Sequence, residues 1–215
     1  MSNPTLTDHL HWVEVGTHLC EHALDGLTDE QYAQASRLPG WTRAYLIAHL
    51  AANAGALRNL VQWAATGEET PMYSSLAQRD ADIENGATRP AAALRAWFGD
   101  QARALAGDLG RLTGEQWRAR VRTAQGRDVS GSQIPWLRAR EVMVHAVDLD
   151  TGVTFADLPD DFLAALEADI RGKRGADTPE IDGSLADRVG YLAGRTTAGV
   201  TTPDGAPAPD LTPWL

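Results

Sequence analysis

The chain has 215 residues, 43% of them hydrophobic, and a formal net charge of −10 at pH 7. This length suffices to bury a good core in one domain, or in one domain with a small addition. The negative charge comes with no dense basic stripe, which argues against a nucleic-acid partner. The apolar runs stop well short of the roughly 20 residues needed to span a bilayer, so we expect no membrane partner either.

Cysteine use and the amino terminus both predict a cytoplasmic protein. Cys20 is the single cysteine, so the chain cannot form an internal disulfide, as is typical of a reducing compartment. The first residues contain no basic region followed by an apolar stretch, which is the pattern of a secretion signal. We therefore expect a cytoplasmic location.

Hydrophobic periodicity predicts four long helices in the first two-thirds of the chain. They cover about residues 7–27, 42–67, 90–112 and 136–149. Thr7 or Asp8 is expected to cap the first helix and Thr42 the second, while Pro90 begins the third. Helices of this length with modest connections predict a four-helix bundle, in which sites are built from inward side chains of facing helices.

Two connections are long, residues 68–89 and 123–135, and we expect both as loops around the mouth of a site. The character of the sequence changes after Gly152. Short helices are expected near residues 161–170 and 185–193, followed by one short strand and a turn near residues 199–205. The expected fold class is mainly α, with a four-helix bundle over residues 1–152 and a small α/β domain over residues 153–215.

The most informative motif is the pair Glu141 and His145, which lies in an otherwise apolar run. On a helix, residues four apart point the same way, so both side chains would face one buried side. His49 lies at the edge of the apolar stripe of the second helix and is expected to face inward. Two histidines and one carboxylate with an open fourth position form the ligand set of a catalytic zinc site. An equally supported alternative is a buried polar network that links the helices without metal.

A second glutamate–histidine pair with the same spacing shows that the spacing alone does not identify a metal site. Glu14 and His18 repeat the pattern, and His11 and His22 extend it. All four residues lie on one flank of the first predicted helix, opposite its apolar face. We interpret this cluster as a solvated surface.

Five segments make the chain similar to a known family: residues 38–43 (LPGWTR), 48–53 (AHLAAN), 69–73 (ETPMY), 79–84 (RDADIE) and 140–149 (REVMVHAVDL). The chain resembles the mycothiol-dependent maleylpyruvate isomerase family, whose amino-terminal part is a DinB-like four-helix bundle. The resemblance implies that His49, Glu141 and His145 bind a divalent metal, for which zinc is the default. It also implies a role in aromatic catabolism.

The carboxy-terminal third resembles the family less completely. Residues 193–195 and the closing Pro213-Trp214-Leu215 match the family's ending, and the resemblance gives Arg195 a role in holding substrate. The region between Ile170 and Leu185 is shortened, and Ala146 stands where many relatives carry another histidine. Neither departure touches the metal triad, and both concern the substrate.

The reaction implied by the resemblance is the cis–trans isomerisation of maleylpyruvate, or of a similar cis-enoyl dicarboxylate, to the fumaryl isomer. The partners are then two small molecules, the thiol mycothiol and the dicarboxylate. In the implied mechanism, a metal-bound thiolate adds to the double bond and gives an enolate. The former double bond is then a single bond, about which the enolate rotates before it expels the thiolate. Cys20 is expected to be a packed core residue and not that sulfur.

Other polar residues are candidates for the same site. Arg79 would grip a substrate carboxylate, although an ion pair with a neighbouring aspartate is its more ordinary role. Tyr73 and Asn53 would line the pocket, the alternatives being a packed aromatic ring and a hydrogen bond between helices. Asp148 shares the face of Glu141 and His145 and would accept a hydrogen bond from a ligand histidine.

Three other functions remain open at this point. A mycothiol S-transferase would use the same thiolate but release a stable conjugate. A metal-dependent hydrolase would need no thiol, because a metal-bound hydroxide would attack the substrate. A non-enzymatic binding module would use the metal or the polar contacts for stability alone and would close the site to solvent.

Overall fold

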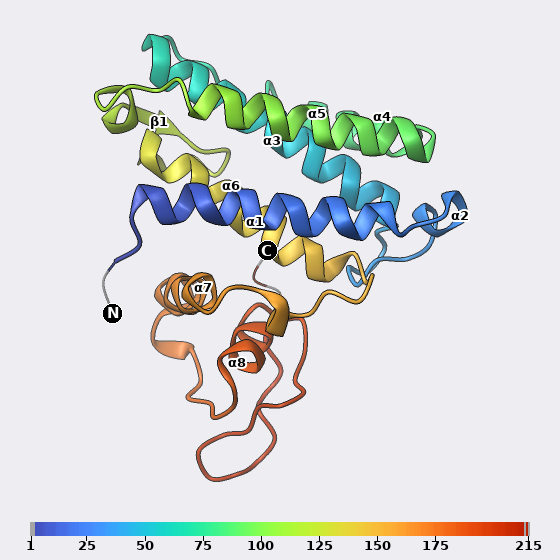
Figure 1. Ribbon diagram of the computed structural model, residues 1–215. Helices are drawn as coiled ribbons and strands as arrows, with labels where there is room; N and C mark the ends of the chain where they lie inside the picture. Colours follow the sequence, from blue (N-terminus) through green and yellow to red (C-terminus); the bar gives the residue numbers. More distant parts are fainter. Residues whose placement is uncertain (1–2, 213, 215) are drawn as a thin grey trace. The chain divides into compact units, whose positions relative to one another are not determined.

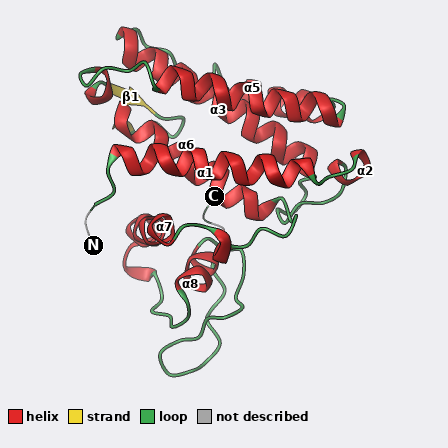
Figure 2. Ribbon diagram, viewed as in Figure 1, coloured by secondary structure: helices red, strands yellow, loops and turns green. Residues whose placement is uncertain are grey.

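The computed structural model describes residues 3–212 and 214, apart from the side chain of Asp177 (Figure 1). Pro213 and Leu215 of the family-like ending lie outside the described residues. The chain divides into two compact units, one of residues 5–151 and one of residues 152–215 together with the amino-terminal end. The described chain is mostly helical, as predicted, although loops make up much of the second unit (Figure 2).

The first unit contains the predicted helix bundle. Its long helices are α1 (Leu6–Asp25), α3 (Arg43–Thr66), α5 (Ala91–Leu109) and α6 (Ile134–Asp148). α1 packs along α6, and α3 packs against both α5 and α6 (Figure 1). The two helices predicted to carry the site, α3 and α6, are therefore neighbours.

The ends of these helices follow their capping residues. The Thr42 hydroxyl accepts a hydrogen bond from the Tyr45 amide at 3.1 Å, which confirms the predicted cap of α3. The predicted cap of α1 was wrong, because Thr5 begins the helix in place of Thr7 or Asp8. The Thr5 hydroxyl accepts from the Asp8 amide at 3.2 Å, and the Asp8 carboxylate accepts from the Thr5 amide at 2.7 Å. This reciprocal pair satisfies two amides that would otherwise lack partners.

A glycine sets the close approach of α1 to α6. A Cβ atom added at Gly16 would lie 2.5 Å from the Cγ2 atom of Val142 and 3.1 Å from the Met143 amide nitrogen. One turn further along α1, the fully buried Cys20 thiol donates to the Val142 carbonyl at 3.3 Å. The packing of α1 therefore fixes the helix that carries Glu141 and His145.

The connections contain more secondary structure than the sequence predicted. Residues 68–89 include α4 (Leu76–Ala87), which is capped by Ser75 and packs against α3. A short helix, α2 (Asp29–Tyr32), follows α1. Of the twelve residues of α4 only Ile83 and Gly86 are buried, so the helix lacks the apolar stripe by which helices are recognised in a sequence.

The second predicted loop is in part a hairpin. Strands β1 (Arg120–Arg122) and β2 (Asp128–Ser130) pair antiparallel, with Val121 opposite Val129. Both valines are buried against a core of α3 and α5 side chains that includes Leu57 and Leu105. Strands of three residues are too short to show an alternating pattern in a sequence.

The second unit is built on α7 (Asp160–Arg174) and α8 (Leu185–Leu192), which pack together. The strand expected near residues 199–205 was wrong in the described part of this unit. Thr201 forms only isolated bridges, to Asp182 and to Pro207. Proline lacks an amide donor and cannot continue a ladder, which limits the pairing here. Over the described residues, no helix is long and apolar enough to cross a membrane.

Candidate metal centre

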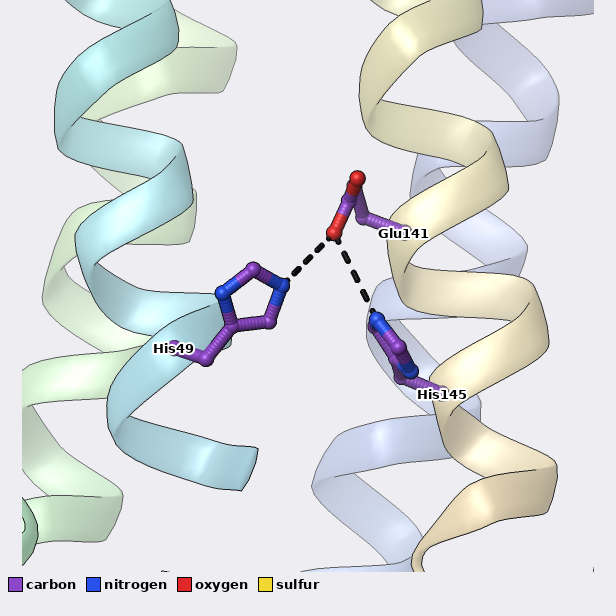
Figure 3. A group of neighbouring side chains, drawn as sticks. All are labelled: His49, Glu141 and His145. Carbon is purple, nitrogen blue, oxygen red and sulfur yellow. Dashed lines mark hydrogen bonds and ion pairs between the residues drawn. The ribbon is translucent and has the colours of Figure 1, made fainter. Parts of the chain in front are cut away.

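The structure brings together the three residues that the sequence singled out. His49 projects from α3, while Glu141 and His145 project from α6, one helical turn apart (Figure 3). The Glu141 Oε2 atom lies 2.8 Å from His49 Nε2 and 3.5 Å from His145 Nε2. One potential ligand atom from each residue lies within 4.8 Å of the other two, and no other such group occurs among the described residues.

This arrangement fits a divalent metal. Zn–N and Zn–O bonds are roughly 2.0–2.2 Å long, so one ion can reach two imidazoles and a carboxylate that are this close together. Both histidines face the same carboxylate oxygen through Nε2. The Glu141 side chain is 18% exposed, whereas the His49 and His145 side chains are 9% and 6% exposed. The centre is therefore buried on the histidine side and reached by solvent at the carboxylate.

The electrostatics of the three groups are coupled. Burial alone would raise the pKa of the Glu141 carboxyl, but hydrogen bonds from His145 and His49 hold that pKa well below its ordinary value. Burial alone would lower the pKa of His145, but hydrogen bonds to Asp148 and Glu141 raise it to about 9. For His49 burial prevails, and its pKa is lowered. In the metal-free protein, Glu141 is thus anionic and His145 carries the proton.

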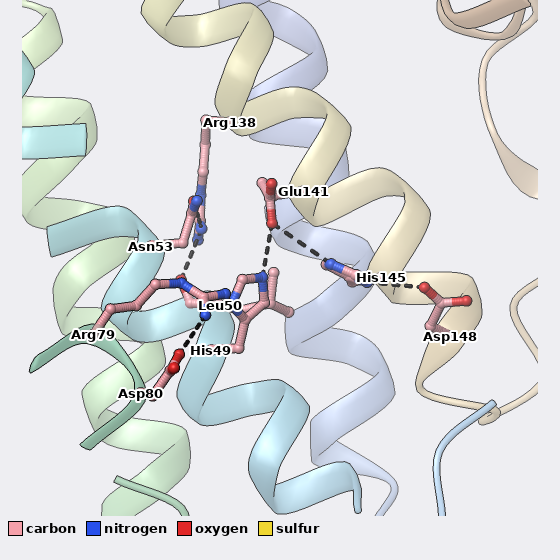
Figure 4. A network of polar contacts seen from close by, with 9 residues as sticks. All are labelled: His49, Leu50, Asn53, Arg79, Asp80, Arg138, Glu141, His145 and Asp148. Carbon is pink, nitrogen blue, oxygen red and sulfur yellow. Dashed lines mark hydrogen bonds and ion pairs between the residues drawn. The ribbon is translucent and has the colours of Figure 1, made fainter. Parts of the chain in front are cut away.

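Asp148 orients His145 from the other side of the ring. Its Oδ2 atom lies 2.8 Å from His145 Nδ1, and Asp148 is fully buried (Figure 4). A carboxylate on one imidazole nitrogen fixes the tautomer that presents the other nitrogen to a metal. The contact predicted for Asp148 is present, and its contribution to metal binding stays a prediction.

Arg79 contacts His49 on the ring nitrogen that faces away from Glu141. Its Nη2 atom lies 3.4 Å from His49 Nδ1, and its Nη1 atom donates to Asp80 at 2.7 Å. Because a guanidinium only donates, His49 Nδ1 accepts and its Nε2 carries the hydrogen that Glu141 accepts. Ligation of a metal through Nε2 would place that hydrogen on Nδ1. In that tautomer His49 Nδ1 could no longer accept a hydrogen bond from Arg79.

Arg138 is a polar residue of this region that the sequence reasoning missed. It is fully buried, and its Nη1 atom donates to the Leu50 carbonyl at 2.7 Å and to Asn53 Oδ1 at 2.9 Å (Figure 4). Its Nε and Nη2 atoms make no hydrogen bond with any described residue. Asn53 thus makes the hydrogen bond between helices that was one of its two predicted roles. Arg138 precedes Glu141 by three residues, a spacing that places it on the same face and that could have revealed it.

Two further residues were predicted for the site, Tyr73 and Arg195. Tyr73 packs beneath Arg79, whose guanidinium carbon lies 5.9 Å from the centre of the ring. Arg195 belongs to the second unit, where its Nη1 atom donates to the Ala193 carbonyl at 2.8 Å. Its proposed contact with substrate stays a prediction. His11, Glu14, His18 and His22 are exposed along α1, in agreement with a solvated surface.

The fold and the site define a helical bundle with a candidate metal centre between facing helices. The chain belongs to the mycothiol maleylpyruvate isomerase family, because the N-terminal domain of that family matches residues 13–150.

Solved structures agree with this assignment. The chain is 36% identical to the mycothiol-dependent maleylpyruvate isomerase and 35% identical to a point mutant of it. In both comparisons the match covers 100% of each chain, with a TM-score of 0.93. YfiT from Bacillus subtilis, a probable metal-dependent hydrolase, is 17% identical with a TM-score of 0.56 over 70% of this chain and 88% of its own, which shows a shared fold. No curated protein matches the sequence.

The proton on His145 predicts how metal affinity depends on pH. A metal binds neutral imidazole, so below the pKa of about 9 the ion must displace this proton. We expect the apparent zinc affinity of the metal-free protein to rise between pH 6 and pH 8, by up to about tenfold per unit. Asp148→Asn removes a carboxylate that raises the pKa and should flatten the rise. Competition titrations against a chelator measure the zinc affinity of both proteins at each pH. A wild-type affinity that does not change with pH would contradict the assignment of His145 as a protonated ligand.

Proposed function

We propose that the protein is a mycothiol-dependent cis–trans isomerase. Its substrate is maleylpyruvate or a similar cis-enoyl dicarboxylate, which it converts to the fumaryl isomer by reversible addition of a metal-bound thiolate. The observation that carries this proposal is the similarity to the mycothiol-dependent maleylpyruvate isomerase over the full length of both chains. The metal is proposed to be zinc, since two imidazoles, one carboxylate and an open position suit a catalytic zinc ion. The cytoplasm is the proposed location.

Each residue of the centre has a role in this proposal. His49, Glu141 and His145 hold the metal, and Asp148 keeps the His145 ring turned so that Nε2 faces Glu141. The metal, when bound, would keep the sulfur of the thiol deprotonated at neutral pH. Arg79, whose guanidinium lies against His49, would offer a charge-assisted hydrogen bond to one substrate carboxylate.

The environment of Cys20 supports an external thiol as the nucleophile. Burial raises the pKa of the Cys20 thiol to about 12, and the thiol already donates to the Val142 carbonyl. Nucleophilic attack requires the thiolate, which this site disfavours. The sulfur that adds to the substrate therefore has to come from a separate molecule.

Turnover with and without mycothiol tests the proposed function. Metal-loaded protein and Cys20→Ala should both isomerise maleylpyruvate when mycothiol is present, and neither should do so when it is omitted. The ultraviolet spectrum follows the substrate, and mass spectrometry of the products detects a stable conjugate. A conjugate as the main product would indicate an S-transferase. Turnover without thiol would indicate a metal-bound hydroxide and a hydrolase.

A second prediction concerns Arg195, which is proposed to hold a substrate carboxylate. Arg195→Ala should leave metal content and melting temperature nearly unchanged while it lowers kcat/KM by at least about tenfold, the loss expected for a charge-assisted hydrogen bond. Arg188→Ala, which removes an arginine paired with Glu167 in the same unit, is the matched control. If the kinetics of Arg195→Ala equal those of wild type, this arginine does not contact substrate.

A further inference from the structure

A cavity of about 350 Å³ lies between α3, α4 and α5. Its volume is within the range of roughly 300–1,000 Å³ that is typical of small-molecule sites. Apart from Asn59, the α3 residues that line the cavity are small, among them Ala52, Gly55 and Ala56. Polar side chains from the other two helices surround the remaining space.

The polar groups of this cavity suit a neutral ligand with many hydroxyl groups. Asn85 and Gln101 line it, and their side chains make no hydrogen bond with any described residue. Each amide offers both a donor and an acceptor. The single carboxylate of Asp82 and the single guanidinium of Arg89 balance in charge, which gives no preference for an ion.

Aromatic residues complete the lining. Trp97 packs against Gly86, where an added Cβ atom would lie 2.5 Å from the indole ring, and the Arg89 guanidinium lies over the same ring at 4.5 Å. The indole is therefore held in place before any ligand binds. Flat rings beside amide and carboxylate groups offer both an apolar surface and hydrogen bonds to a sugar or cyclitol ring.

The cavity and the candidate metal centre share one helix, α3. On α3, the spacing of Ala52 and Ala56 from His49 places all three on one face. On α4, Asp82 lies one turn after Arg79, whose guanidinium contacts His49 Nδ1. Tyr73, which packs beneath Arg79, also lines the cavity. Tyr73 and Arg79 therefore connect the lining of the cavity to His49.

We propose that this cavity binds the polyhydroxylated part of the thiol whose sulfur is held at the metal centre. The inference rests on the proposed function, because mycothiol carries its cysteine on an amino sugar that is joined to a cyclitol. The sugar and cyclitol rings lie between α3, α4 and α5, and the cysteinyl arm passes Tyr73 to reach Glu141. The cavity thus distinguishes this thiol from small thiols that lack the two rings.

Two leucine substitutions test the site. Gln101→Leu and Asn85→Leu keep the approximate size of each side chain and remove its hydrogen-bonding groups. Each should raise the KM for mycothiol at least about fivefold, as expected for a lost hydrogen bond of roughly 1 kcal/mol, with little change in the KM for maleylpyruvate. Gln62→Leu, at an exposed position of α3 outside the cavity, is the matched control. Melting temperatures verify that all three variants are folded.

Calorimetry with a thiol-free probe separates this inference from the proposed function. The probe is the glucosaminyl-inositol part of mycothiol, added to metal-free protein. We expect wild type and Gln62→Leu to bind it and the two cavity variants to bind it at least about fivefold more weakly. Absence of binding to wild type, or equal binding by all proteins, would overturn the cavity as the site. Loss of the proposed function would instead show as turnover that does not depend on mycothiol.

Discussion

His145→Ala and His49→Ala should each lose most of the metal that the wild-type protein retains, which we expect to be about one divalent ion per chain. Each substitution removes one of three protein ligands and also the Nε2 atom that faces Glu141. We expect the metal affinity to fall by at least about 100-fold, since loss of an outer-sphere partner alone costs roughly 10–100-fold. Isomerase activity should fall with it. Elemental analysis after dialysis against a weak chelator measures the occupancy.

The chain supplies its own control for this experiment. His18→Ala removes the histidine of the exposed Glu14–His18 pair on α1, which has the same spacing as Glu141 and His145. This variant should retain wild-type metal content. Full metal content in His145→Ala and His49→Ala would remove the three residues from consideration and would leave a polar network without metal.

Gly16→Ala should destabilise the bundle although it adds only one methyl group. The new Cβ atom would lie 2.5 Å from Val142 Cγ2 and 3.1 Å from the Met143 amide nitrogen. The backbone of α6 cannot yield without moving Glu141, so we expect the free energy of unfolding to decrease by about 1–3 kcal/mol, as is typical of overpacking. Metal affinity should fall as well, because α6 carries two of the three proposed ligands.

Gly107→Ala is the matched control on α5. Gly107 is exposed, and its added Cβ atom would meet only the Arg111 guanidinium at 3.6 Å. Alanine is favoured over glycine in a helix interior by roughly 0.5–1 kcal/mol, so this variant should be more stable than wild type. Urea unfolding at equilibrium measures the free energy of unfolding of both variants. Equal stability of Gly16→Ala and wild type would show that α1 and α6 do not pack as described.

The geometry of a helix explains why the candidate centre could be predicted from the sequence. Glu141 and His145 are four residues apart, so a helix alone brings them together, and the apolar run around them indicates that they are buried. The prediction of His49 required one further argument, namely that this residue lies at the edge of the apolar stripe of α3 and therefore faces inward. The same reasoning predicts Arg138, a charged residue on that buried face, but the sequence interpretation passed over it.

The elements that the sequence did not predict, α4 and the β1–β2 hairpin, depend on contacts between distant segments. α4 has few buried residues and packs against α3. Its residue Arg79 contacts His49, and its residues Asp82, Asn85 and Gly86 line the cavity. The β1–β2 hairpin depends on two valines that are buried against α3 and α5. Such elements leave no periodic pattern because tertiary packing, and not the local sequence, determines them.

X-ray absorption at the zinc edge tests the central claim most directly, since it reports the atoms bound to the metal. In zinc-loaded protein we expect two imidazole nitrogens and carboxylate oxygen at roughly 2.0–2.2 Å. Addition of mycothiol should introduce one sulfur at roughly 2.3 Å, in wild type and in Cys20→Ala alike. A metal environment that stays free of sulfur under conditions of full turnover would contradict the claim that an external thiolate binds at the metal.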